Sequence, residues 1–301
     1  MWQRLGNIFK SHWAQVPVAV HLEKDIYRIF YSRRIKGKSY PYYIEFDVCK
    51  KIITKNPVGP ILKLGRRGSF DWAGIMPTEI VNFKNRSLLY YIGWSRREDV
   101  PYHNNLGLAV SRPRSNLWKK YSEGPIFSTS RHEPGYIGTI GIIRSQKKFF
   151  GLYLACRKWK KIKKRIEPIY DLKIATSKNG LDWAPIKNGL RLLAGEGGLS
   201  KASIIKLGKK FYVWFSSRAA KDYRNNPKNG YKIICATSKN IFSWRRIKKY
   251  KLKCEKKHKN ETKMVAYPHV IKHKKILYMF YNGNEFGKTG IFLAKMEAKI
   301  Q

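Results

Sequence analysis

Acidic residues are scarce in this chain of 301 residues. It has 19 Asp and Glu residues against 63 Lys and Arg residues, which gives a formal net charge of +44 at pH 7. Such an excess predicts an anionic partner: nucleic acid, an acidic membrane surface, or a phosphorylated or nucleotide-linked substrate. The alternative is that the lysines are solvated all over the surface. The basic run 157–165 interleaves Trp159 with lysines, as single-stranded nucleic-acid sites do, but no nucleic-acid-binding motif accompanies it, so we do not expect nucleic acid as the partner.

Long apolar runs, paired cysteines and cofactor motifs are also missing. No stretch approaches the run of about 18 apolar residues that a membrane-spanning helix needs. Cys49, Cys156, Cys235 and Cys254 are scattered without CxxC spacing, so we expect reduced thiols with neither a metal nor a disulfide framework. We find no dinucleotide fingerprint, P-loop or nucleophile elbow, and we expect no cofactor. The N-terminus lacks a signal-peptide pattern, so we expect a cytoplasmic protein, with peripheral contact to the anionic inner membrane face as one use of its charge.

What the chain does have is a repeat. Apolar strands can be aligned on Pro17, Pro77, Thr139, Ala202 and Pro268, at spacings of 60, 62, 63 and 66 residues. Each is followed by a turn and a second strand rich in aromatic and β-branched residues. These second strands are expected at 26–31, 88–94, 149–155, 211–215 and 277–281. Third strands are expected at 42–48, 106–111, 172–177, 232–238 and 291–295.

A tryptophan begins the expected fourth strand in three repeats, at Trp118, Trp183 and Trp244. The next one would fall past the end of the chain, and Trp2 supplies it from the other end. Four antiparallel strands in each of five repeats predict an all-β fold, a five-bladed β-propeller whose ring is closed by the N-terminal strand. The alternative, a β-sandwich with accidental spacing, does not explain five agreeing registers. The repeats leave no linker, so we expect residues 1–301 to form a single domain.

Three repeats carry a carboxylate six residues before the first-strand position, at Asp71, Glu133 and Glu196. The last repeat has Thr262 there, with Glu261 beside it. Because the first strands of a propeller line its channel, the loops that lead into them share one face, and loops on a rigid scaffold often carry function. We expect the three carboxylates to form one catalytic pocket. The alternative is that each accepts hydrogen bonds within its own turn.

Carboxylates around one pocket suit glycosyl transfer, in which one of raised pKa protonates the leaving oxygen and another attacks or activates water. Aromatic rings stack on sugar faces, and guanidinium groups reach hydroxyls or phosphate, although blade packing explains any single aromatic equally well. The expected substrate-binding residues are His12, Gln15, Trp94, Arg96, Tyr102, His103, Asn104, His132, Tyr170, Arg218, Tyr267, Asn282 and Asn284. We expect no metal site. His269, on the last first strand, is a weak metal candidate, because a lone histidine is more often packed and hydrogen-bonded.

Several strings resemble the five-bladed propeller glycosidase superfamily, which includes arabinanases, xylosidases, invertases and levansucrases. The strings are SHWAQVP (11–17), FDWAGIMP (70–77), YIGW (91–94), VPYHN (100–104), EPIY (167–170) and YMFYNGN (278–284). More closely, the chain looks like the glycosidase-like proteins of bacterial surface-polysaccharide gene sets. The resemblance implies that Asp71 matches the second-blade Asp and Glu133 the third-blade general acid, while Glu196 has no family role. The first-blade Asp is absent, because Ser11 and His12 stand in its place.

The predicted function is a carbohydrate-active enzyme of surface-polysaccharide (O-antigen or capsule) metabolism that cleaves or transfers a glycosyl group in the channel mouth. The missing first-blade carboxylate leaves room for Glu196 or His12 to replace it, or for loss of catalysis. One alternative is a glycosyltransferase or phosphorylase acting on a nucleotide-linked or phosphorylated sugar, which the net charge and arginines such as Arg97 and Arg131 favour. The other is a non-catalytic propeller that binds a glycan or an anionic polymer.

Overall fold

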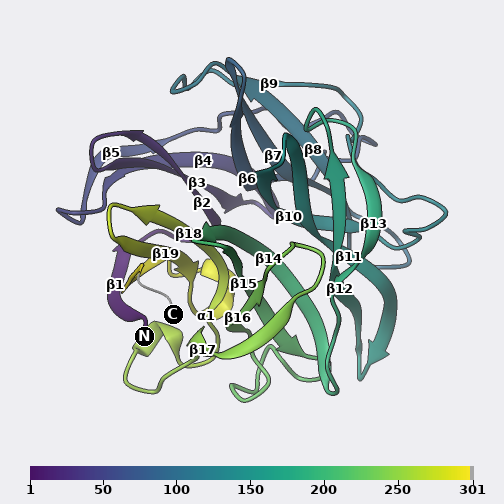
Figure 1. Ribbon diagram of the computed structural model, residues 1–301. Coiled ribbons are helices and arrows are strands. Elements are labelled where there is room, and N and C mark those ends of the chain that lie inside the picture. The colour runs from purple at the N-terminus through teal and green to yellow at the C-terminus, as the bar shows by residue number, and fades with distance from the viewer. Residues whose placement is uncertain (299–301) are drawn as a thin grey trace.

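Strands make up nearly all the regular structure of residues 1–298, which the computed structural model describes, with the backbone alone at residues 187 and 188 (Figure 1). The first antiparallel group is β2 (Ala14–Glu23), β3 (Ile26–Ile35), β4 (Lys38–Asp47) and β5 (Ile52–Val58). The second is β6 (Gly74–Phe83), β7 (Arg86–Ser95), β8 (His103–Ser111) and β9 (Lys119–Lys120). The third is β10 (Ile137–Ser145), β11 (Lys148–Ile162), β12 (Arg165–Ser177) and β13 (Ala184–Leu190). The fourth is β14 (Glu196–Leu207), β15 (Lys210–Ala219), β16 (Lys232–Ser238) and β17 (Arg245–Leu252). The last is β18 (Ala266–His273), β19 (Ile276–Asn282), β20 (Ile291–Glu297) and β1 (Gln3–Phe9).

The all-β prediction is confirmed. Two short helical turns, η1 (Lys259–Glu261) and α1 (Asn284–Gly287), complete the regular structure of residues 1–298. The part of the chain that the structure describes contains no helix long and apolar enough to cross a membrane. Single parallel bridges, Ser39 to Gly74 and Tyr170 to Gly198, join the first four groups in pairs, so the strands form three sheets.

The first strands of the groups lie against one another in a cycle: β2 contacts β6, β6 contacts β10, β10 contacts β14, β14 contacts β18, and β18 contacts β2. In Figure 1 these strands surround the centre, while β5, β9, β13 and β17 lie toward the rim. Second strands are packed on both faces by neighbouring groups, which is why they read as continuous apolar runs. In β3, for example, Ile29, Phe30 and Tyr31 are all completely buried.

The N-terminal strand completes the last group. β1 runs antiparallel to β20, with Gln3 opposite Lys295 and Phe9 opposite Ile291. Trp2 is buried against Trp214, and the indole N–H groups of both tryptophans donate to the Tyr250 carbonyl at 2.9 Å. The first and last segments of the chain are therefore held together by apolar packing and hydrogen bonds.

Every first strand has a register shift near its start. The shifts lie at 15–18, 77–79, 137–140, 200–203 and 266–269. Val16, Lys201 and Tyr267 have positive φ angles of 54°, 49° and 58° within or beside these irregularities. Bulges re-aim side chains, and the one in β14 contains Lys201, whose side chain is completely buried at the centre of the molecule.

Candidate active site

The three carboxylates predicted to be catalytic are each held by a hydroxyl and a cation from their own group of strands. Asp71 accepts hydrogen bonds from the Tyr91 hydroxyl at 3.2 Å and the Lys120 ammonium at 2.5 Å. Glu133 accepts one from the Tyr153 hydroxyl at 2.8 Å and is 2.9 Å from the Lys173 ammonium. The hydroxyls come from second strands, and the cations come from third or fourth strands.

Glu196 follows the same arrangement. Its carboxylate accepts hydrogen bonds from the Ser217 hydroxyl at 2.5 Å, the Arg246 guanidinium at 2.7 Å and the Leu193 amide at 2.8 Å. Burial alone would raise the pKa of Glu196, but these hydrogen bonds outweigh it and keep the pKa below its ordinary value. Glu196 is therefore ionised at neutral pH, which does not suit a general acid.

Glu261, in the last group, reproduces this arrangement, although the repeat spacing placed Thr262 at the matching position. Its carboxylate accepts a hydrogen bond from the Tyr281 hydroxyl at 2.9 Å and pairs with Arg4 at 2.5 Å. Among the described residues, none of the four carboxylates shares a hydrogen-bonding partner with another. These contacts support a stabilising role in each group, and the common catalytic pocket stays a prediction.

Asp71 does border a cavity, of about 910 Å³, between the β5–β6 connection and β9. Its walls include Lys63, Arg66, Arg67 and Lys119, so the cavity is strongly basic. The side chain of Asp71 is only 1% exposed and is paired with the Lys120 ammonium. An anionic ligand suits this cavity better than a direct reaction at Asp71.

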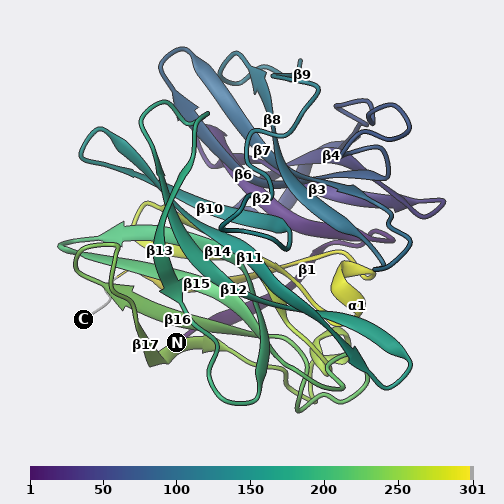
Figure 2. The same ribbon diagram turned by 90° about the vertical axis from the view of Figure 1, so that its right-hand side faces the viewer.

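A second set of side chains converges on the face where the chain enters the first strands. We call it the tyrosine–arginine cluster, and it comprises Tyr102, Tyr136, Tyr170, Arg218, Tyr231 and Tyr267. Four of these were predicted from separate loops, and four groups of strands supply the six side chains. Figure 2 shows α1 and the tip of the β11–β12 hairpin projecting on one side of the molecule, which is the side of these loops.

The cluster is held by hydrogen bonds and ring packing. Tyr170 and Tyr231 are hydrogen-bonded through their hydroxyls, and the Arg218 guanidinium donates to the Tyr170 hydroxyl at 3.0 Å. The Arg218 guanidinium also lies 4.8 Å from the centre of the Tyr170 ring. The Tyr231 and Tyr267 ring centres are 5.9 Å apart. Tyr170 and Tyr231 thus connect the third, fourth and last groups of strands.

Burial keeps the phenols of Tyr102, Tyr136, Tyr170 and Tyr267 neutral. It raises the pKa of Tyr102 to about 12 and those of Tyr136, Tyr170 and Tyr267 well above the ordinary value. Burial opposes the charge of Arg218, but the surrounding tyrosines outweigh it and raise the pKa of Arg218. The cluster therefore offers neutral hydroxyls and aromatic faces around one permanent cation, as a sugar with one anionic group requires.

A pocket of about 460 Å³ lies beside the cluster, lined by residues 97–101 and 164–167 and by Arg224. Glu167 accepts hydrogen bonds there from the Tyr223 hydroxyl at 2.6 Å and from Arg224 at 2.9 and 3.1 Å. Burial alone would raise the pKa of Glu167, but these donors outweigh it and lower the pKa.

The sequence analysis expects residues 167–170 in a loop. In the structure the segment belongs to β12, because the β11–β12 hairpin extends to the pair Ile162 and Arg165.

Two more predicted residues adjoin the cluster. The Gln15 amide donates to the Phe286 carbonyl at 2.8 Å, and the Phe286 ring centre is 6.1 Å from that of Tyr231. The His103 and Tyr136 ring centres are 6.4 Å apart. Gln15 and His103 therefore lie at the edge of the same site.

Trp94 and Arg96 lie between the first two groups of strands, where Arg34 lies 5.9 Å from the Trp94 ring and Arg96 lies 6.0 Å from the Trp72 ring. Asn104 lies opposite Trp94 in the β7–β8 pairing. These residues form a separate set, which does not take part in the hydrogen bonds described for the tyrosine–arginine cluster.

The other predicted binding residues have local contacts. Asn282 is completely buried, where its amide donates to the Ala14 and Gly290 carbonyls and accepts from the Val16 amide. Asn284 accepts from the amides of residues 263 and 264. His132 is exposed and accepts from Arg131, and His12 is exposed beside Trp13.

The sequence analysis did not name Tyr136 and Tyr231 of the cluster. The one sequence signal that could have found them is that each is an aromatic residue directly before or near the start of a strand.

His269 is buried near two other buried ionisable groups, Glu79 and Lys201. Its Nε2 atom is 3.0 Å from the Ala19 carbonyl. Burial and the charge of Lys201 lower the pKa of His269 to about 3. Burial also raises the pKa of Glu79 to about 7 and lowers that of Lys201 to about 8. An ammonium group so near His269 makes this position unfavourable for a metal cation.

Gly198 fixes the position of Tyr170, and its replacement gives a stability prediction. A Cβ atom at Gly198 would lie 2.4 Å from the Tyr170 ring, so Gly198→Ala must displace that ring. We expect a loss of about 1–3 kcal/mol in the free energy of unfolding, measured by urea denaturation. Gly124→Ala, whose Cβ would have no atom within 4 Å, is the control. Equal stability of the two variants would contradict the packing described for Tyr170.

Comparisons with known proteins bear on the fold. No protein-family model matches the chain. It is 28% identical over 312 residues to an uncharacterized protein of Mycobacterium tuberculosis, present in strains CDC 1551 / Oshkosh and ATCC 25618 / H37Rv, and the match covers 98% of this chain and 99% of that protein.

Solved structures match over nearly the whole chain. A glycoside hydrolase has a TM-score of 0.75 at 18% identity, covering 99% of this chain and 92% of that protein. A thermostable family-43 glycoside hydrolase has a TM-score of 0.68 at 16% identity, covering 94% and 88%. The fold is that of the β-propeller glycoside hydrolases. An exo-1,5-α-L-arabinanase from a bovine ruminal metagenomic library shares this propeller fold, with a TM-score of 0.65 at 14% identity over 94% of this chain and 92% of that protein. The predicted superfamily resemblance is confirmed at the level of the fold.

Proposed function

We propose that this protein is a carbohydrate-active enzyme that cleaves or transfers a glycosyl group, built as a five-bladed propeller closed by β1. The observation that carries the proposal is the convergence of Tyr102, Tyr170, Arg218 and Tyr267 on one face of a propeller-glycosidase fold. Aromatic faces and hydroxyls are what a sugar ring needs, and a pocket adjoins them. The resemblance noted in the sequence suggests a bacterial surface polysaccharide as the substrate class.

The charges around the site favour an acidic or phosphorylated sugar over a neutral one. Arg218 is buried among the tyrosines. The adjoining pocket is lined by four cations, Arg97, Lys164, Arg165 and Arg224, and by three acids, Glu98, Asp99 and Glu167, so cations are in excess. Fork-shaped guanidinium groups bind carboxylates and phosphates with two parallel hydrogen bonds. A sugar phosphate, a nucleotide-linked sugar or a uronic acid would meet this requirement.

A thermal-shift screen of the purified protein tests the binding step. A ligand that binds only the folded state at a hundredfold excess over its Kd stabilises it by about 2.7 kcal/mol. We expect acidic or phosphorylated sugars to raise the melting temperature and neutral glycans to raise it less. Tyr267→Phe, which leaves the ring and removes the hydroxyl, should reduce the shift. A shift that is unchanged in this variant and in Arg218→Lys would place the ligand elsewhere.

The catalytic groups are tested by a panel of four matched variants, which we expect to lose similar stability, about 1–3 kcal/mol each. The variants Asp71→Asn, Glu133→Gln and Glu196→Gln remove the proposed catalytic charges. Glu261→Gln is their control, since Glu261 has the same kind of partners but was not predicted to be catalytic. General acid or base catalysis contributes about 10²–10⁴-fold, so the proposal requires a loss of that size in kcat at one or more of the three and an unchanged kcat in Glu261→Gln. If kcat is unchanged in all four variants, Asp71, Glu133 and Glu196 are excluded as catalytic groups, and Glu167 is the next carboxylate to test.

A further inference from the structure

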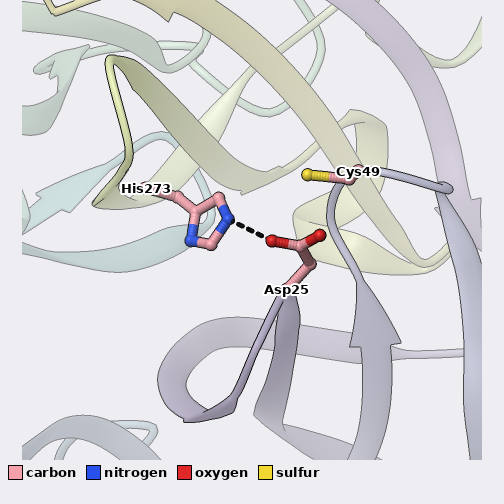
Figure 3. Close-up of side chains that lie close together, drawn as sticks. All are labelled: Asp25, Cys49 and His273. Carbon is pink, nitrogen blue, oxygen red and sulfur yellow. Dashed lines mark hydrogen bonds and ion pairs between the residues drawn. The ribbon is translucent and has the colours of Figure 1, made fainter.

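Three side chains able to ligate a metal converge where the first and last groups of strands meet. Asp25 lies in the turn between β2 and β3, Cys49 follows β4, and His273 ends β18 (Figure 3). A carboxylate oxygen, the thiol sulfur and an imidazole nitrogen all lie within 4.8 Å of one another. We call these three residues the seam cluster. Their wide separation in the sequence explains why cysteine spacing gave no sign of it.

The imidazole of the seam cluster is held in a fixed orientation. His273 Nδ1 is 3.1 Å from the hydroxyl of the buried Tyr27, and Nε2 is 2.7 Å from Asp25 Oδ1. Metal-ligating histidines characteristically use the second ring nitrogen for such a hydrogen bond, which fixes the tautomer and the ring plane. Tyr27 therefore leaves Nε2 directed toward Asp25 and Cys49.

We propose that the seam cluster binds a Zn²⁺-class cation through the Asp25 carboxylate, the Cys49 thiolate and His273 Nε2, with water as a fourth ligand. Mixed sulfur, nitrogen and oxygen donors suit Zn²⁺, whereas Mg²⁺ and Ca²⁺ prefer oxygen alone. Bonds of about 2.0–2.3 Å in tetrahedral geometry place ligand atoms roughly 3.5 Å apart. Cys49 is exposed, so its side chain can close the remaining distance without disturbing the core.

Two local features set how tightly the cation binds. The Lys274 ammonium is 2.9 Å from Asp25 Oδ1 and must leave, which its 67% exposure allows. The Cys49 thiol must also release its proton when the metal binds.

A cation bound at the seam cluster links the first and last groups of strands. Asp25 and Cys49 belong to the first group of strands and His273 to the last, and 248 residues separate Asp25 from His273. A cation bound by all three requires the two groups to be docked. It therefore stabilises the folded state alone, and independently of any sugar.

The deciding experiment is a Co²⁺ titration of the tag-free, EDTA-treated chain, followed by absorption spectroscopy. We expect one equivalent of cobalt to produce a thiolate-to-cobalt charge-transfer band and the intense visible bands of a four-coordinate ion, and Zn²⁺ to abolish both. Cys49→Ser should lose the charge-transfer band. Cys254→Ser, which removes a thiol outside the cluster, should keep it. No band in the wild type, or a band that survives in Cys49→Ser, overturns the proposal.

Thermal unfolding supplies a second readout that does not depend on the cysteine. Zn²⁺ at a hundredfold excess over its Kd is expected to raise the melting temperature by about 5 °C. Asp25→Asn should lose most of that shift, while Asp182→Asn, an exposed acid outside the cluster, should keep it. An equal shift in both variants would mean that zinc binds somewhere else on the chain and would overturn the assignment.

Discussion

A chain that begins at residue 10 is expected to be unfolded or aggregated under conditions in which the full chain is folded. The deletion removes Trp2 and Phe9, which lie in two different core clusters. Truncating a large buried aromatic residue costs about 3–5 kcal/mol, and the two together approach the whole stability of a typical domain, about 5–15 kcal/mol. The deletion also removes Arg4, the counter-charge of the buried Glu261, and leaves β20 as an open edge. Far-ultraviolet circular dichroism and urea denaturation measure the result.

A permuted chain is the matched control for this deletion. Gln3 lies opposite Lys295 in the β1–β20 pairing, so residues 1–9 can follow residue 298 through a short glycine linker as an ordinary hairpin. The permuted chain has the same strand without its connection to β2, and we expect it to recover cooperative unfolding. A stable deletion variant would contradict the role of β1 in completing the last group of strands, and an unfolded permuted chain would show that the link to β2 matters as well.

The strands could be predicted because most of them have a local signal in the sequence, and that signal recurs in each repeat. The second strands are buried on both faces, so they are continuous aromatic and β-branched runs that the sequence displays directly. β5 was missed because Ile52–Val58 is largely exposed and begins without a tryptophan. The length of the β11–β12 hairpin was also missed, because its tip is a run of exposed lysines and arginines that reads as a loop.

The site was only partly predictable. Tyr102, Tyr170, Arg218 and Tyr267 could be named because polar and aromatic residues in the loops of one propeller face must lie near one another. The partners of the loop carboxylates could not be named. Lys173, for example, lies 40 residues from Glu133, and no local pattern marks a lysine in a strand as the partner of a distant acid. The carboxylates therefore read as catalytic in the sequence, while the structure gives each a local cation.

The burial of Glu79 and Lys201 could not be predicted from the sequence. Glu79 and Lys201 are charged residues within strands, and alternation alone assigns such side chains to solvent. The cyclic arrangement of the first strands instead turns them inward, where both are buried. The Lys201 ammonium has no hydrogen-bond partner among the described residues.

Lys201→Met is expected to stabilise the protein by about 3 kcal/mol at pH 7. Burial lowers the pKa of Lys201 from 10.5 to about 8, and each unit of this shift corresponds to about 1.4 kcal/mol that folding must supply to keep the ammonium charged. Methionine has a similar length and no charge, so it removes the cost of burying the ammonium without leaving a large cavity. Urea denaturation of both proteins at pH 7 measures the difference. Lys209→Met, at an exposed turn position, removes the same charge and should change stability by no more than about 0.5 kcal/mol.

The pH dependence separates the charge of Lys201 from simple packing. Because its pKa is lower in the folded than in the unfolded state, its contribution to stability is fully present above the unfolded value of 10.5 and is lost as the pH falls through about 8. The advantage of Lys201→Met should therefore shrink to about 1.4 kcal/mol at pH 9.5, since the unfolded chain then gains less by keeping the proton. A gain that is independent of pH would mean that methionine only packs better, and a loss at pH 7 would mean that Glu79 compensates the ammonium. If the gain in stability comes with a loss of sugar binding, the buried cation is retained for function at the expense of stability.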